Sequence, residues 1–200
     1  MIINSTIARN MAGYYYGGGV ANLGGTALMS FCTIYGNSAS IGGGIAVVDG
    51  SVTLSKSIVA GNTLVAQEPP FHRPIMGTLL SQGFNLIQNM MNIIPQHTSA
   101  PDTSNIAVSR FMSVHDTTVS ASDLTKIFDP QGPQNNGGQT KTYKLLPGTG
   151  DPAIDAIPLA ACHIAVIFDV ASHRFIDQRG AARPDDNEQF CDIGAYESSG

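Results

Sequence analysis

The sequence predicts an all-β fold, a right-handed parallel β-helix with rungs of about 25 residues and an irregular C-terminal cap. Two observations predict it. Motifs built on Gly and Asn recur 25 or 27 residues apart, and the apolar runs between them are short and β-branched. No segment of residues 1–65 shows the helical period of about 3.6 residues. We therefore expect β-helix rungs over residues 1–92, an irregular excursion or distorted rung over 93–122 and a capping module over 123–200.

An apolar residue, two further residues and an Asn mark each rung. The marks are Ile7-Ala-Arg-Asn10, Ile34-Tyr-Gly-Asn37, Val59-Ala-Gly-Asn62 and a weaker Leu86-Ile-Gln-Asn89. Asn tolerates positive φ, and stacked Asn side chains can hydrogen-bond from rung to rung. An identical residue on every rung creates no unique reaction centre, so we predict a structural ladder of Asn10, Asn37, Asn62 and Asn89. A row of catalytic amides is the alternative.

Stacked rungs place equivalent side chains above one another, about 4.8 Å apart. Two inward columns are therefore expected: Ile7, Ile34, Val59 and Leu86 form the first, and Ser5, Cys32, Ser57 and Phe84 form the second. After residue 65 the repeat is interrupted. The segment 67–74 contains three prolines, which predicts a loop that leaves the β-helix.

The first rung is two residues longer between Asn10 and Gly17 than the second is between Asn37 and Gly42. Tyr14, Tyr15 and Tyr16 occupy this longer turn. Exposed aromatic rings on the side of a β-helix provide a surface on which sugars can stack, so these tyrosines are candidate glycan contacts. The alternative is a turn whose rings pack against a preceding rung.

A series of short motifs follows in the C-terminal part of the chain. In order they are Phe128-Asp-Pro130, Gln134–Thr140, Leu145–Gly148, Asp151–Asp155, Asp177–Gly180, Arg183-Pro184 and Cys191–Glu197. This ordered set resembles the C-terminal module of bacterial right-handed parallel β-helix repeat proteins of the choice-of-anchor type. The rungs are similar to those of the same proteins and, more distantly, to the repeats of polymorphic outer-membrane proteins. The resemblance implies a secreted or cell-surface location, and it assigns no catalytic residue.

The C-terminal module is expected to cover the open end of the β-helix, because exposed strand edges invite polymerisation. Its charged residues are dense for this chain: Asp177, Arg179, Arg183, Asp192 and Glu197. We interpret them as a salt-bridged clasp between loops, since Arg forks bind carboxylates in pairs. A glycosidase carboxylate pair or a Ca²⁺ site is the alternative. The clasp is favoured because neighbouring arginines lower the pKa of carboxyl groups rather than raise it.

The cysteines favour one structural bridge. Cys162 and Cys191 enclose a loop of about 30 residues, and in an exported protein we predict a disulfide between them, worth about 3–4 kcal/mol. Cys32 is expected to be a small buried filler of the second inward column. The histidines and cysteines follow no metal-ligand spacing, so the sequence predicts no metal and no cofactor.

Charge and hydropathy restrict the partners. Only 12% of the residues are charged and the net charge is −5, which leaves no basic stripe and argues against a nucleic-acid partner. The longest apolar run, residues 160–168, is far shorter than the roughly 18 residues of a membrane helix, so no membrane span is expected. The N-terminus lacks the features of a signal peptide. Because the repeat already runs at residue 2, we expect the C-terminal part of a longer protein.

These features predict a non-enzymatic β-helix module, secreted or on the cell surface, with a structural or adhesin-like role and a polysaccharide or another surface protein as partner. The alternative is a polysaccharide-active enzyme, a lyase or a glycoside hydrolase. Such an enzyme requires paired carboxylates or a comparable constellation on one face of a rung. Residues 1–62 contain a single acid, Asp49, which favours the non-enzymatic hypothesis.

Overall fold

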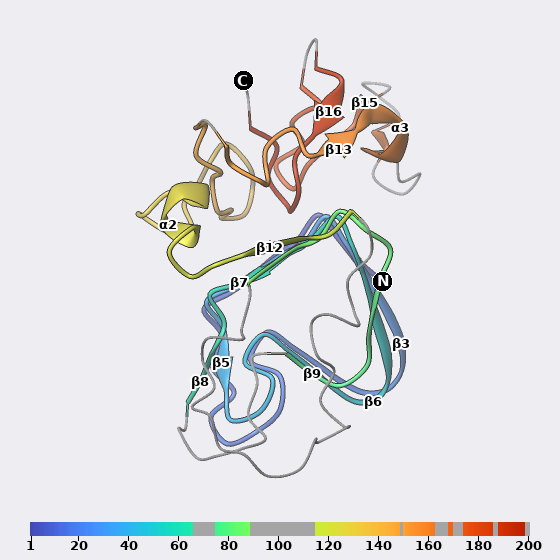
Figure 1. The fold of residues 1–200 in the computed structure, drawn as a ribbon, viewed down its shortest axis with the longest axis vertical. Helices are drawn as coiled ribbons and strands as arrows, with labels where there is room; N and C mark the ends of the chain where they lie inside the picture. The colour runs from blue at the N-terminus through green and yellow to red at the C-terminus, as the bar shows by residue number, and fades with distance from the viewer. Residues whose placement is uncertain are drawn as a thin grey trace.

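A computed structural model describes residues 1–65, 75–88, 115–148, 150–162, 168–169, 174–185 and 188–198. The chain forms a parallel β-helix, called the solenoid below, whose coils lie over one another, with a C-terminal module beside it (Figure 1). The predicted loop at 67–74, Asn89 and residues 93–114 of the predicted excursion lie outside the described residues. The all-β parallel fold expected from the repeat is confirmed.

Three parallel sheets form the sides of the solenoid. The first contains β1 (Ile2–Ile3), β3 (Val20–Ser30), β6 (Ile45–Ser55), β9 (Ile75–Met76) and β10 (Leu79–Ser81). The second contains β2 (Thr6–Ala8), β4 (Thr33–Tyr35), β7 (Ile58–Ala60), β11 (Leu86–Gln88) and β12 (Thr117–Val119). The third pairs β5 (Ser38–Ala39) with β8 (Thr63–Leu64).

The coils are numbered by their strand in the second sheet: β2, β4, β7 and β11 belong to the first, second, third and fourth coils. The pairing of the first three coils follows the sequence repeat. In the second sheet Ile7 lies opposite Ile34, and Ile34 lies opposite Val59. Two glycine triplets, residues 17–19 and 42–44, stack as well, since the N–H of Gly18 donates to the carbonyl of Gly42 at 3.3 Å. A Cβ on Gly18 would lie 2.4 Å from the carbonyl oxygen of Gly43, so the close approach of two coils requires glycine here.

The fourth coil departs from the predicted alignment by one residue. Ile87, not Leu86, lies opposite Val59. Likewise Asn85, not the predicted Phe84, follows Ser57 in its column, since the N–H of Ser57 donates to the side chain of Asn85. The cause is one extra residue at the corner before β11. The third coil turns there on Lys56 alone (φ 52°), whereas the fourth uses Gly83 (φ 92°) and Phe84 (φ 56°).

The strand β12 lies within the range predicted as irregular, 93–122. It pairs in parallel with β11, with Leu86 opposite Thr117 and Gln88 opposite Val119. The last part of that range is therefore a regular strand that extends the second sheet. Its apolar residue Val119 is buried.

The core has two parts, one on each face of the second sheet. The interior of the solenoid is filled by Met29, Cys32, Ile34, Ile45, Val47, Val52, Leu54, Val59, Leu79 and Ile87. The outward face of the second sheet carries Ile58, Ala60, Leu86 and Val119, which pack against apolar residues of the C-terminal module such as Ile127, Leu145 and Ile193. Buried Cys32 lies in the interior, as expected for a small filler.

The C-terminal module lies along the side of the solenoid, not over its end (Figure 1). It contacts the first coil, where Asn4 Nδ2 donates to the carbonyl of Ile176 at 2.6 Å. It also contacts the third coil, where the N–H of Gly194 donates to the carbonyl of Lys56 at 3.0 Å. The predicted end cap is wrong because the second sheet has two apolar faces. All three residues of β7 (Ile58–Ala60) are buried, as in a strand covered on both sides.

The module itself has little regular structure. Its elements are α2 (Leu124–Ile127), β13 (Ile157–Pro158), α3 (Leu159–Cys162), β14 (Phe168–Asp169), β15 (Arg174–Phe175) and β16 (Phe190–Cys191). The strands form two antiparallel pairs, β13 with β16 and β14 with β15. A disulfide joins Cys162 to Cys191, the pair expected from the sequence, with a Cα–Cα distance of 6.0 Å. Within the described ranges, no helix has the length and apolarity needed to cross a membrane.

Candidate functional site

The longer turn of the first coil is built on the second coil. Met11 lies opposite Ser38 and Tyr16 opposite Ile41, so the separation drops from 27 to 25 residues across the turn. The two residues by which this turn is longer than the turn of the second coil therefore lie between Gly13 and Tyr16, at Tyr14 and Tyr15. The turn is anchored at its centre, where the carbonyl of Gly13 accepts hydrogen bonds from the N–H of Ser40 at 3.1 Å and from its hydroxyl at 2.8 Å. The turn therefore has a defined backbone.

The tyrosine side chains project from this turn. Their exposed fractions are 92% for Tyr14, 77% for Tyr15 and 41% for Tyr16, and the neighbouring Met11 is 74% exposed. Among the described residues, none of the three rings has a ring partner and none of the three hydroxyls has a hydrogen-bond partner. Tyr14, Tyr15 and Tyr16, called the tyrosine turn below, together form an aromatic surface without a partner among the described residues.

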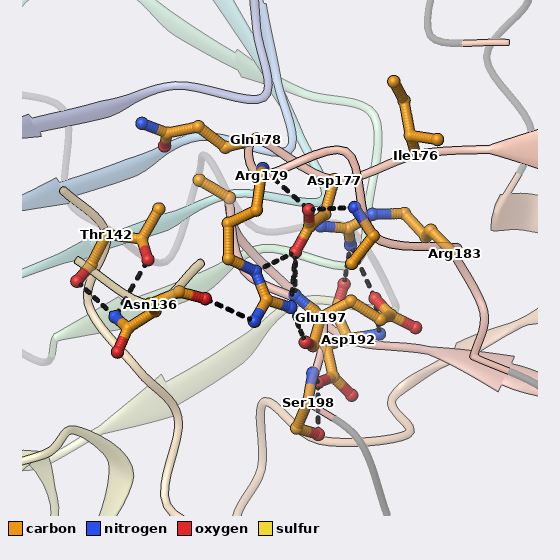
Figure 2. A network of polar contacts seen from close by, with 12 residues as sticks. Asn136, Thr142, Ile176, Asp177, Gln178, Arg179, Arg183, Asp192, Glu197 and Ser198 are labelled. Atoms are coloured by element: carbon orange, nitrogen blue, oxygen red, sulfur yellow. Dashed lines mark hydrogen bonds and ion pairs between the residues drawn. The ribbon is translucent and has the colours of Figure 1, made fainter. Parts of the chain in front are cut away.

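The second candidate site is the set of charged residues in the C-terminal module, which the structure brings together (Figure 2). Arg183 is its centre and is 2% exposed. Its guanidinium pairs with Glu197 Oε2 at 3.0 Å and donates to the carbonyls of Asp192 at 2.8 Å and Gly194 at 3.0 Å. The same group lies 4.3 Å from the ring centroid of Phe31 in the solenoid, so this arginine also binds the module to the second coil.

Arg179 and Asp177 form a second pair. Arg179 Nε donates to Asp177 Oδ2 at 2.8 Å, and Arg179 Nη1 donates to the carbonyl of Asn136 at 3.3 Å. The carboxylate of Asp177 also accepts from the N–H groups of Arg179, Ala181 and Glu197 at 2.7–3.1 Å. This carboxylate therefore fixes the turn in which it lies and the C-terminal segment at Glu197.

Asp192 connects two more loops. Its Oδ2 accepts from both the N–H and the hydroxyl of Ser198 at 2.6 Å, and its Oδ1 accepts from the N–H of Asp155 at 2.8 Å. Its own N–H donates to Glu197 Oε2 at 3.0 Å. All the residues predicted as a clasp thus lie in one network, called the clasp below: Asp177, Arg179, Arg183, Asp192 and Glu197.

Burial dominates the electrostatics of the clasp. It raises the pKa of Glu197 to about 8, although Arg183 acts in the opposite direction. Burial also raises the pKa of Asp192. The expectation that the arginines would prevent raised pKa values is therefore wrong, since desolvation penalises a carboxylate more than these neighbours stabilise it. The clasp contains two guanidinium groups and three carboxyl groups, so one retained proton makes it neutral.

The clasp carboxyl groups are not accessible to a substrate in this structure. Asp177, Asp192 and Glu197 are each at most 2% exposed, and each accepts hydrogen bonds from backbone N–H groups or an arginine. A glycosidase pair requires two carboxyl groups that face a bound sugar. In the described part of the chain, no three His, Cys, Asp or Glu residues are grouped so as to hold a metal ion.

The asparagine ladder extends over the first three coils. The N–H of Asn10 donates to Asn37 Oδ1 at 3.0 Å, and the N–H of Asn37 donates to Asn62 Oδ1 at 2.9 Å. In the fourth coil Gln88 Oε1 accepts a hydrogen bond from the N–H of Gly61 at 2.7 Å, and the predicted ladder residue Asn89 lies outside the described residues. The side chains thus satisfy backbone donors at the turn, where no strand partner is present.

The second inward column was predicted only in part: Cys32 and Ser57 stack as expected, but Asn85 and Asp116 continue the column in place of Phe84 and make it a polar one. Along one corner, the N–H of Cys32 donates to Ser57 Oγ at 3.1 Å, that of Ser57 donates to Asn85 Oδ1 at 3.0 Å, and that of Asn85 donates to Asp116 Oδ1 at 2.8 Å. The residue type changes at every coil, so no repeated letter marks this column. Only the shared ability of the side chains to accept a hydrogen bond could have indicated it.

Comparison with known proteins adds no assignment: no family model, no curated protein and no solved structure matches the chain.

Proposed function

We propose that this chain is a non-enzymatic β-helix module of a secreted or cell-surface protein, with a structural or adhesin-like role, and that it contacts glycans through the tyrosine turn. The observation that carries the proposal is the unpartnered exposure of Tyr14 and Tyr15 on an anchored turn. Large apolar surfaces that a chain leaves uncovered on a rigid support are typical of binding sites.

Two further observations support the proposal. The disulfide Cys162–Cys191 favours an oxidising compartment, because disulfides persist outside the cytosol. The clasp carboxyl groups accept hydrogen bonds from backbone N–H groups and arginines inside the module, so these acids serve to hold loops together. Both features suit a rigid extracellular module better than a catalyst.

The test is a binding and turnover screen over a panel of neutral and acidic polysaccharides. Affinity gel electrophoresis measures binding, and release of reducing ends and of unsaturated products measures turnover. We expect retardation by at least one polysaccharide without any product. Product formation by the purified chain would instead support the enzymatic alternative, and absence of both binding and turnover would refute the glycan role.

A further inference from the structure

We propose that the tyrosine turn selects an uncharged polysaccharide whose pyranose rings offer an open C–H face, such as a β-linked glucan. This inference rests on the proposed glycan contact and specifies its ligand class. It follows from three observations: the distribution of charge in the first coils, the state of the tyrosine rings and the anchoring of the turn.

The charged side chains of residues 1–65 are directed away from the tyrosine turn. Arg9 Nε donates to the hydroxyl of Tyr143 in the C-terminal module at 3.1 Å. Lys56 Nζ lies 5.7 Å from the ring centroid of Phe31 at the corner that faces the same module. The carboxylate of Asp49 accepts from the adjacent N–H of Gly50 at another corner of the coil. No other charged residue occurs in this segment.

Within residues 1–65, the surroundings of the turn are therefore polar but uncharged. Ser38 and Ser40 of the second coil lie beneath it. An acidic polysaccharide requires a cation to compensate the desolvation of each carboxylate, and residues 1–65 offer none here. With a net charge of −5, the chain as a whole also repels a polyanion.

The rings supply the complementary surface. A tyrosine ring has a negative face and a large apolar area. The C–H groups of an all-equatorial pyranose carry a small positive charge and lie on both faces of the sugar ring. Because Tyr14 and Tyr15 make no internal ring contact among the described residues, their faces are available for such stacking. The hydrogen bonds from Ser40 to Gly13 fix the backbone beneath them, which lowers the entropic cost of binding.

The experiment compares two soluble derivatives of one backbone, hydroxyethyl cellulose and carboxymethyl cellulose, which differ in charge at similar substituent size. We expect affinity gel electrophoresis to show retardation by the hydroxyethyl polymer and weaker or no retardation by the carboxymethyl polymer. Binding to the neutral polymer is expected to change less than twofold between low and high salt, because no ion pair forms.

Variants locate the site. The triple substitution of Tyr14, Tyr15 and Tyr16 by Ala is expected to weaken binding by roughly tenfold or more, because it removes every ring on which a sugar could stack. The matched triple substitution by Phe keeps the rings and is expected to stay within about threefold of the parent. Both variants should melt at the temperature of the parent, since the tyrosine hydroxyls have no partner among the described residues.

Each other outcome overturns a distinct statement. Salt-sensitive binding of the carboxymethyl polymer alone would refute the ligand class and leave the glycan role standing. If the triple Ala variant binds the neutral polymer as well as the parent does, the tyrosine turn is refuted as the binding site. Absence of binding to both celluloses refutes the proposed β-glucan ligand, while absence of binding across the whole polysaccharide panel refutes the glycan role itself.

Discussion

The solenoid and the C-terminal module are stabilised by different means. In the solenoid, the hydrogen bonds between parallel strands and those of a repeated asparagine supply most of the polar contacts. Residues 1–65 contain only three charged side chains. In the module, the strands are two residues long, and a buried charge network and a disulfide hold the loops. Repetition lets each coil serve as the template for the next, whereas an irregular fold needs specific contacts between distant residues.

The comparison predicts that damage to the module has larger consequences than damage to one rung. The clasp groups are buried and interdependent, so removal of one leaves its partners unpaired. A rung contact is one of several similar contacts. The following substitutions test this difference, from the largest expected effect to the smallest.

Arg183→Ala should have the largest effect. It leaves Glu197 without its guanidinium partner and the carbonyls of Asp192 and Gly194 without a donor. Loss of one partner of a buried pair costs about 3–5 kcal/mol of unfolding free energy, measurable by urea denaturation. Lys126→Ala is the matched control, because the pair of Lys126 with Asp123 is exposed, and no measurable change is expected. Equal effects of both substitutions would contradict the role of the clasp.

Replacement of Cys162 and Cys191 by Ser should destabilise the protein by about 3–4 kcal/mol, because the bridge closes a loop of 29 residues in the unfolded chain. The measurement is thermal unfolding with and without reductant. The parent should lose stability in reductant and the double variant should not respond. Cys32→Ala is the control, since Cys32 forms no disulfide, and it should keep the response of the parent to reductant.

Asn37→Ala should cost about 1–3 kcal/mol, because it leaves buried backbone groups unsatisfied. Asn37 Nδ2 donates to the carbonyl of Ile7 at 2.8 Å and its Oδ1 accepts from the N–H of Asn10. Asn10→Ala, at the exposed end of the ladder, should cost less. Denaturant titration measures both, and glycan binding should be unchanged in both. A larger loss for Asn10→Ala would contradict the ladder.

The pH dependence of stability tests the charge state of the clasp. Because burial raises the pKa of Glu197 from 4.5 in the unfolded chain to about 8, the folded state keeps a proton that the unfolded state has lost. The stabilisation is complete below pH 4.5 and decreases as the pH rises to about 8, by up to about 1.4 kcal/mol per pH unit. Glu197→Gln should reduce this slope but not abolish it, because burial also raises the pKa of Asp151 to about 6 and the pKa of Asp192. A parent that gains stability between pH 5 and 8 relative to the variant would contradict the sign.

The sequence predicted the first three coils because their marks survive at regular spacing. It misplaced the fourth coil, since the alignment followed Asn89 while the additional corner residue, Gly83, shifted Ile87 into register with Val59. The extra residue lies at a corner and changes no strand pattern. The extra residue becomes evident only when β11 is seen paired with β7 in the structure.

The clasp residues were predicted as a group, but not their electrostatics, because burial depends on the packing of distant loops. The position of the module was also missed. A signal was present: Ile58, Val59 and Ala60 form an uninterrupted apolar strand, and a strand with one solvated face would alternate. Such a run in one sheet of a β-helix indicates that another element covers that sheet.

The central claim is that the C-terminal module lies along the side of stacked coils, and nuclear Overhauser contacts of two adjacent amides test it most directly. The N–H of Ala195 lies 3.0 Å from Thr33 Oγ1 and that of Gly194 lies 3.0 Å from the carbonyl of Lys56. We predict cross-peaks from these amides to Thr33 and Lys56, in the second and third coils. Cross-peaks only to residues 117–119, in the last strand of the second sheet, would indicate an end cap and contradict the claim.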